Sequence, residues 1–219
     1  MRILITAGPS WEPIDRVRRL TNFSTGTLGT ALAREAARRG HQVVLMRGEA
    51  ATCREHPRDV ELVEFGGSAE LGRQLELHQG TVFHAVWHAA AVADFRPGGL
   101  FAGEPGSGLR PVEAGKVASR EGPLWLRLDP APKLIEKLRD WFPRAWLAGW
   151  KYEVEGGRER LLGLAREQLV RCRTDACVVN GPAWGEGFGV VTREGAVEPC
   201  SDAGELAGVL LRLATGAGS

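Results

Sequence analysis

A short segment ahead of the first helical pattern, Asn22–Gly29, carries residue types that could bind an anion. It reads N-F-S-T-G-T-L-G. The first N–H groups of a helix have no partner within the helix, and the helix dipole adds a partial positive charge there. Gly26 lets the backbone approach a ligand closely. The segment therefore predicts a phosphate-binding helix start, whereas Gly29 is explained more simply by tight packing of the helix against a strand.

Arg18 and Asn22 stand four residues apart and add a guanidinium and a carboxamide beside this segment. Either side chain alone would more often be solvated than bound to a ligand. Because they accompany the helix start, both are candidates for binding a phosphorylated molecule.

Several other kinds of site are excluded because their patterns are missing. The sequence has no G-x-x-x-x-G-K-[ST] phosphate loop, no G-x-S-x-G hydrolase turn, and no G-x-G-x-x-G directly after the first strand. The single tyrosine, Tyr152, is followed four residues later by Gly156 instead of the lysine that short-chain dehydrogenases need. His84 and His88 lack a third ligand and are interpreted as core or edge residues.

The composition is that of a folded, nearly neutral protein. Of 219 residues, 28 are Lys or Arg and 27 are Asp or Glu, which argues against a general nucleic-acid binder. No apolar run is long enough to span a membrane and no secretory signal is present, so we expect a cytoplasmic protein without a membrane partner. Four cysteines without zinc-like spacing are predicted to be small buried hydrophobes: Cys53, Cys172, Cys177 and Cys200.

Lysine is scarce and confined to one part of the chain. The four lysines are Lys116, Lys133, Lys137 and Lys151, while arginine supplies the other cations. Each lysine is therefore a candidate for a specific role.

Strand and helix patterns alternate along most of the chain. Strands are expected at 3–6, 42–46, 60–64, 82–88, 145–149 and 175–180, with a terminal hairpin at 188–192 and around Val197. Helices are expected at 27–39, 69–78, 131–141, 159–171 and 203–213, the first capped by Ser24 or Thr25 and ended by Gly40. This predicts an α/β protein with a doubly wound, mostly parallel Rossmann-like sheet and helices on both faces.

The alternation breaks down between Arg96 and Gly122, where glycine and proline recur. We expect a single domain over residues 1–214, a long flap loop inserted around 97–122, and a frayed tail at 215–219. A linker between two domains is the alternative for the loop.

Three separated motifs give the sequence a family resemblance. They are A-G-P-S-W-E-P-I-D-R-V-R at 7–18, T-N-F-S-T-G at 21–26, and A-A-A-V-A-D-F-R-P at 89–97. In this order they resemble the phosphopantothenate–cysteine ligase family of coenzyme A biosynthesis, also called phosphopantothenoylcysteine synthetase. The resemblance runs from residue 3 to about residue 191.

This resemblance implies a ligase that joins 4'-phosphopantothenate to L-cysteine. The carboxylate attacks the α-phosphorus of a nucleoside triphosphate, CTP or ATP, and expels pyrophosphate; the cysteine amine then opens the acyl-nucleotide. Such an enzyme mainly positions groups and neutralises phosphate charge, with Mg²⁺ as cofactor. The resemblance also implies a homodimer. Because the chain begins at its first strand, we expect a stand-alone ligase domain without a flavin-dependent half.

The resemblance also implies roles for individual residues. Asn22 matches an asparagine that holds phosphopantothenate and the intermediate, Arg18 an arginine contributed across the dimer, and Lys116 a flap lysine that contacts the triphosphate. Nucleotide binding is implied for residues of several segments: Gly8, Ser24, Gly26, Ala90, Asp94, Lys116, Pro132, Lys133, Leu134, Trp150 and Lys151. No metal-ligating residue is implied. Strand packing remains the alternative for Ala90, and a turn before Pro97 the alternative for Asp94.

Two positions depart from the family pattern, since Gln168 and Cys172 stand where its helix has lysines. We expect Lys133 or Lys151 to supply the missing charge from a different backbone position. A non-catalytic homologue that binds nucleotide or phosphopantothenate is the second hypothesis. An NAD(P)-dependent reductase is the third.

Overall fold

The computed structural model describes residues 1–104, 106, 108–112 and 122–216. Lys116, the lysine expected on the flap, lies outside these residues. No helix in the described part of the chain is long and apolar enough to cross a membrane.

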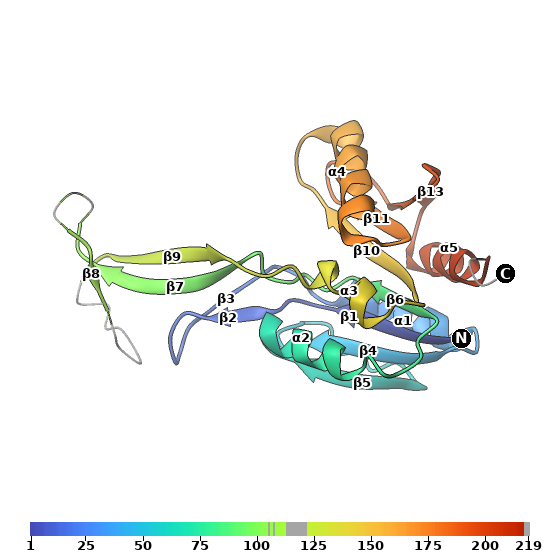
Figure 1. Cartoon of the computed structure of the whole chain (residues 1–219), viewed down its shortest axis with the longest axis horizontal. Coiled ribbons are helices and arrows are strands. Elements are labelled where there is room, and N and C mark those ends of the chain that lie inside the picture. The colour runs from blue at the N-terminus through green and yellow to red at the C-terminus, as the bar shows by residue number, and fades with distance from the viewer. Residues whose placement is uncertain (105, 107, 113–121, 217–219) are drawn as a thin grey trace.

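The centre of the molecule is an eight-stranded sheet with the order β13-β12-β11-β10-β6-β1-β4-β5 (Figure 1). Its six parallel strands are β1 (Arg2–Ala7), β4 (Gln42–Gly48), β5 (Val60–Phe65), β6 (Ala85–His88), β10 (Trp146–Tyr152) and β11 (Ala176–Asn180). The hairpin of β12 (Phe188–Thr192) and β13 (Val197–Cys200) extends the sheet in antiparallel fashion. This confirms the predicted doubly wound, mostly parallel sheet. Because the strand order reverses between β1 and β6, ligands are expected beyond the carboxyl ends of these two strands.

Helices cover both faces of this sheet, as predicted. The helices are α1 (Thr27–Arg38), α2 (Ser68–Leu77), α3 (Leu138–Trp141), α4 (Gly157–Cys172) and α5 (Ala203–Gly216), with a 3₁₀ turn, η2, at Leu134–Glu136. Apolar residues of α1 and α5 form one core with alternate residues of the strands, Ile3 and Ile5 among them. Residues of α2, α3 and α4 pack on the opposite face, against Leu4, Leu147 and Cys177 among others.

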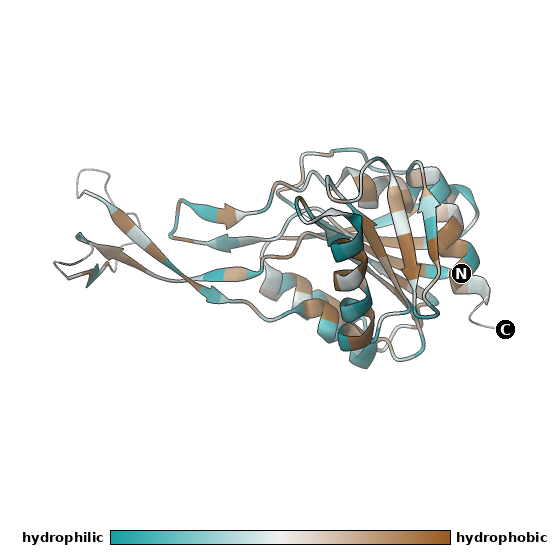
Figure 2. Cartoon of the chain, turned by 90° about the horizontal axis from the view of Figure 1, so that it is seen from above, coloured by the Kyte–Doolittle hydropathy of each residue, from teal (hydrophilic) through white to brown (hydrophobic). Residues whose placement is uncertain are grey.

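The prediction of an irregular flap loop around residues 97–122 is wrong for the described residues of that segment, because most of them form strands. β7 (Phe95–Ala102) pairs with β8 (Arg110–Pro111) and with β9 (Leu124–Pro130), and together they form an arm that extends from the sheet (Figures 1 and 2). Pro97 and Gly99 are tolerated because they flank a register shift in an exposed ribbon. The segment between β1 and α1 also contains a hairpin, β2 (Trp11–Pro13) with β3 (Arg19–Thr21).

Three expected boundaries also differ. The helix expected at 131–141 is only η2 followed by the short α3, because Pro130 and Pro132 restrict the backbone before it. The strand expected from residue 82 begins at Ala85. α5 continues to Gly216, so Thr215 is helical, and its hydroxyl donates to the carbonyl of Leu211 at 2.7 Å. Residues 217–219 of the expected frayed tail lie outside the described part of the chain.

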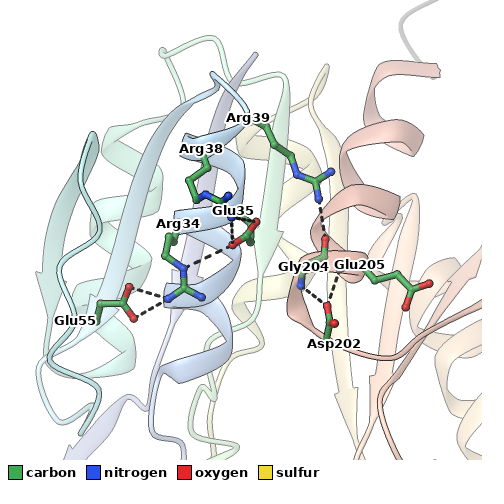
Figure 3. Close-up of polar contacts among 8 residues, drawn as sticks. All are labelled: Arg34, Glu35, Arg38, Arg39, Glu55, Asp202, Gly204 and Glu205. Carbon is green, nitrogen blue, oxygen red and sulfur yellow. Dashed lines mark hydrogen bonds and ion pairs between the residues drawn. The ribbon is translucent and has the colours of Figure 1, made fainter.

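A hydrogen bond joins the end of α1 to the start of α5 (Figure 3). Arg39, just after α1, donates to the carbonyl of Gly204 in the first turn of α5 at 3.0 Å. Asp202 caps α5 because its carboxylate accepts the N–H groups of Gly204 and Glu205 at 2.8 and 2.9 Å. Cys172, Cys177 and Cys200 are buried free thiols, as predicted, whereas Cys53 is half-buried.

Candidate functional site

The three sequence motifs meet beyond the carboxyl ends of β1 and β6. Ala91, in the loop after β6, is their common contact: its carbonyl accepts from the Ser10 N–H at 3.1 Å and from the Asn22 side-chain amide at 3.0 Å. Its own N–H donates to the carbonyl of Gly8 at 2.9 Å. The structure therefore places Gly8, Asn22 and the Ala89–Val92 loop side by side at the switch in strand order, where an open α/β sheet binds ligands.

Two buried hydroxyl groups fix the shape of this loop. Ser10 is completely buried, and its Oγ accepts from the Ala93 N–H at 2.9 Å. Thr6 is completely buried as well, and its Oγ1 accepts from the Ala90 N–H at 3.2 Å. Ala90 and Ala93 are thus held through their backbones, which leaves little freedom in the loop that the ligand would contact.

His88 completes the buried polar group beneath the loop. Its Nδ1 lies 2.9 Å from Thr6 Oγ1, and burial lowers the pKa of His88 to about 4. The imidazole is therefore neutral at physiological pH. The sequence-based interpretation of a core histidine is confirmed for His88, which is buried. His84 is instead exposed just before β6, and its Nδ1 accepts the Arg2 N–H at 3.0 Å. The described residues contain no cluster of three or more metal-ligating side chains.

The start of α1 is shaped by glycine instead of by a side-chain cap. Gly26 is the N-cap residue with φ 77°, and no side chain caps it, so the expected capping by Ser24 or Thr25 is wrong. A Cβ on Gly26 would lie 3.0 Å from Ala51 Cβ and 3.4 Å from Gly8 Cα. Gly8 also has a φ of 77°. The two glycines therefore let two loops touch directly beneath the helix start.

Gly29 serves helix–strand packing, as the simpler interpretation predicts. A Cβ at this position would lie 2.4 Å from Ala7 Cβ, a separation that real atoms do not reach. The first turn of α1 thereby sits directly on the end of β1. Thr25 Oγ1 accepts the Thr27 N–H at 3.3 Å. The next two N–H groups of the first turn have no acceptor within the helix and are therefore available to a ligand.

Arg18 lies at the turn of the β2–β3 hairpin, which extends away from the sheet (Figure 1). It pairs with Asp15 at 2.8 Å. The N–H groups of Val17 and Arg18 lower the pKa of the Asp15 carboxyl by hydrogen bonding, the Val17 contact most strongly. Arg18 is therefore held at the tip of the hairpin, at the far end of β3 from Asn22.

The residues expected on the nucleotide side come together near β6 and β10. Asp94 forms an ion pair with Lys133, and its carbonyl accepts the Ala131 N–H at 2.9 Å. The segment then runs over β10, since a Cβ on Gly149 would lie 2.6 Å from Ile135 Cδ1. Pro132 is exposed. Leu134 packs against the core beneath α2, so its side chain supports the segment from below.

Trp150 and Lys151 point to opposite faces of β10. Trp150 packs against the core of α1 and α5, and its Nε1 is buried without a hydrogen-bond partner among the described residues. Lys151 faces the other side and lies 3.8 Å from Glu153.

Gln168 and Cys172 are buried on the face of α4 that meets the sheet. The side-chain amide of Gln168 donates to Cys177 Sγ at 3.3 Å, and Cys172 is completely buried. This face of α4 therefore carries no charge at the two positions where the resemblance places lysines.

The sequence was compared with models of known protein families. The family model of the DNA/pantothenate metabolism flavoprotein C-terminal domain matches residues 1–205. The chain belongs to this family. The sequence resemblance is thereby confirmed at the level of family.

Individual relatives of the domain agree with this assignment. The chain is 35% identical over 182 residues to the coenzyme A biosynthesis bifunctional protein CoaBC of Thermococcus kodakarensis, covering 82% of this chain and 41% of that protein. The chain thus spans less than half the length of that curated relative. The structure of the DNA/pantothenate metabolism flavoprotein from Streptococcus pneumoniae superposes with a TM-score of 0.84 at 23% identity, over 99% of both chains. The C-terminal domain of a CoaBC protein superposes with a TM-score of 0.72 at 26% identity, covering 96% of this chain and 92% of that one.

Sequence reasoning missed the residues that hold the domain's loop after β6 from below. Thr6 is the last residue but one of β1 and His88 is the last residue of β6, and a polar residue at the carboxyl end of a buried strand was the available signal. Ser10 was within a motif but carried no assigned role. The contact of all three motifs with Ala91 has no signal in the sequence, because it depends on the pairing of distant strands.

Proposed function

We propose that this chain is a ligase that joins 4'-phosphopantothenate to L-cysteine through an acyl-nucleotide intermediate, with CTP or ATP as co-substrate. The observation that carries the proposal is the meeting of the three family motifs on Ala91 at the switch between β1 and β6. Family membership supports it further. The reaction makes few demands on acid–base groups, which suits a site built from backbone N–H groups, amides and cations.

In this proposal each segment holds one part of the substrates. Asn22 positions phosphopantothenate and the intermediate, and the start of α1 with Ser24, Gly26 and Gly8 binds phosphate. Ala90 permits close approach, while Asp94 and Lys133 face the nucleotide. The nucleotide contact expected for Trp150 is not retained, because its side chain packs in the core of α1 and α5 on the other face of β10. Lys116 would add a phosphate contact from outside the described residues.

Mg²⁺ enters the proposal with the nucleotide, because divalent cations bridge the oxygens of polyphosphates. The carboxylates described on the nucleotide side are poor ligands for an additional ion, since Asp94 pairs with Lys133 and Glu153 lies beside Lys151. We therefore assign no metal ligand to this chain.

We also propose that the protein acts as a homodimer that meets through the arm and the β2–β3 hairpin. The strand register places an unbroken set of apolar residues on one face of the arm: Phe95, Pro97, Leu100, Ala102, Leu124, Leu126, Leu128 and Pro130. Phe95 is 48% exposed and Leu128 43%. An exposed, continuous apolar face of this size is expected to be buried against another protein surface. We assign that surface to a second copy of the chain, because the family resemblance implies a homodimer in which Arg18 reaches the partner's site.

A non-catalytic binding homologue is the second candidate, favoured by the uncharged face of α4 at Gln168 and Cys172. One experiment separates the two. The protein is incubated with 4'-phosphopantothenate, L-cysteine, Mg²⁺ and either CTP or ATP, and pyrophosphate and the mass of the condensation product are measured. We expect pyrophosphate release that requires phosphopantothenate. Nucleotide binding without pyrophosphate release from either triphosphate would contradict the ligase and favour the binding homologue.

A further inference from the structure

Lys151 is a half-buried cation near the carboxyl end of β10, with a side chain 29% exposed. Side chains alternate along a strand, so Lys151 shares a face with Gly149. That face is covered by α4, because a Cβ on Gly149 would lie 2.6 Å from Gln168 Nε2. The ammonium group of Lys151 therefore emerges between the strand and the helix.

The surroundings of Lys151 neutralise it poorly. Its ion pair within the described residues is with Glu153, at the long separation of 3.8 Å. Burial raises the pKa of the Cys172 thiol and raises that of Cys177 to about 12, and the charge of Lys151 acts against both shifts. These two thiols stay neutral at physiological pH and therefore give Lys151 no negative charge. The carboxylate of Glu136, which also influences Cys172, is paired with Arg171 at 3.3 Å.

Lys151 also lies beside the segment assigned to the nucleotide. Ile135 packs on Gly149, two residues before Lys151 on the same face of β10. Lys133, two residues before Ile135, is engaged by Asp94. Of the two lysines expected to supply charge, Lys133 is therefore neutralised by a direct ion pair with Asp94. The carboxylate nearest to Lys151 among the described residues, that of Glu153, is farther away.

We propose that Lys151 binds the phosphate chain of the nucleoside triphosphate from β10, on the face where Gln168 and Cys172 leave α4 uncharged. This inference rests on the proposed function, because it needs a nucleotide at the carboxyl edge of β6 and β10. A half-buried ammonium group whose carboxylate partner, Glu153, is distant is stabilised by an anion that approaches it closely. Lysine binds phosphate in this way, as a compact positive charge. Gln168 cannot take this role while its amide is held by Cys177.

The test compares lysine variants in direct titrations with CTP, ATP and inorganic tripolyphosphate. Lys151→Met keeps the apolar stem of the side chain and removes its charge, which protects the packing against α4. Lys137→Met is the matched control, since Lys137 is exposed at the start of α3 and carries the same charge. The variant Lys151→Met/Gln168→Lys returns a positive charge from the helix to the same face.

We expect Lys151→Met to weaken triphosphate and tripolyphosphate binding by about tenfold or more, with Lys137→Met close to wild type. The double variant should recover a large part of the loss. Equal affinity of Lys151→Met and wild type would overturn the inference, and so would an equal loss in Lys137→Met or a folded double variant that recovers nothing. Circular dichroism and thermal unfolding establish that each variant is folded.

The outcomes for this inference and for the ligase proposal can be told apart. Nucleotide binding that depends on Lys151, without pyrophosphate release, would support the inference while the ligase proposal fails. Ligase activity with unchanged nucleotide affinity in Lys151→Met would overturn the inference alone. A KM that rises for the nucleotide but not for phosphopantothenate or cysteine would support a binding contact over a general structural effect.

Discussion

The side-chain amide of Asn22 donates a hydrogen bond to the carbonyl of Ala91 at 3.0 Å, across 69 positions of sequence. This contact joins the loop before α1 to the loop after β6. The carboxamide of Asn22 also has an oxygen acceptor that this hydrogen bond does not use. Asn22 is therefore both a link between two loops and a candidate substrate contact.

Two substitutions of Asn22 test its place in the site. Asn22→Asp removes the donor to Ala91 and adds negative charge beside the phosphate site, whereas Asn22→Ala only removes the amide. We expect pyrophosphate release to fall by at least about a hundredfold in Asn22→Asp and by less in Asn22→Ala, because an oriented contact contributes a few kcal/mol. Equal rates in both variants and wild type would remove Asn22 from the site.

Gly29→Ala tests the contact between α1 and β1. The added Cβ overlaps Ala7 Cβ at 2.4 Å, so we expect a loss of about 2–3 kcal/mol in the free energy of unfolding. Gly163→Ala in α4 is the matched control, because nothing lies within 4 Å of its Cβ. That variant should be stabilised by about 0.5–1 kcal/mol, since alanine favours a helix. Urea denaturation measures both, and similar effects of the two substitutions would contradict the packing.

His88 should make stability depend on pH. Burial lowers its folded-state pKa from 6.5 to about 4, so the unfolded chain binds a proton between these values that the folded chain does not. The stabilising contribution is complete above pH 6.5 and is lost as the pH falls towards 4, by about 3 kcal/mol in total. His88→Met should flatten this part of the profile of unfolding free energy. The exposed His56 supplies the control variant His56→Gln, and a slope that changes equally in both would rule out His88 as its source.

The ion pair of Asp94 and Lys133 should affect binding more than stability. Both side chains are substantially exposed, at 67% and 44%, so reversing the pair changes the free energy of unfolding by less than about 1 kcal/mol. Asp94→Lys/Lys133→Asp retains the pair with its polarity exchanged. We expect its KM for the nucleotide to rise about tenfold or more because the charges no longer match the ligand. A swapped variant with normal nucleotide kinetics would show that the pair is only structural.

A charge on the apolar face of the arm should dissociate the proposed dimer. Leu128 lies on that face and is 43% exposed, so Leu128→Asp would bury a carboxylate between two copies. Sedimentation velocity should show a monomer for this variant and a dimer for wild type. Val170→Asp is the control, because Val170 is 81% exposed on α4. A wild-type monomer at micromolar concentration would contradict the dimer.

Much of the fold was predictable because it is encoded locally. The run from Ile3 to Thr6, the helix from Thr27 and the stop at Gly40 each depend on neighbouring residues, and their order defines a doubly wound sheet. The arm was not predictable in this way. Pro97 and Gly99 read as breakers of regular structure, yet β7 accommodates them with a register shift, because an exposed ribbon does not need every ladder hydrogen bond.

The candidate site also has features that are encoded locally and features that depend on the tertiary structure. The sequence alone determined the alternating α/β pattern, the three motifs and the confinement of lysine to residues 116–151. Only the tertiary structure decided that the motifs meet on Ala91, that Lys133 faces Asp94, and that Lys151 lies on the face of β10 where Gln168 and Ile135 cover Gly149. The reason is physical: parallel strands bring residues together by register and by alternation of faces, and both depend on which strands pair.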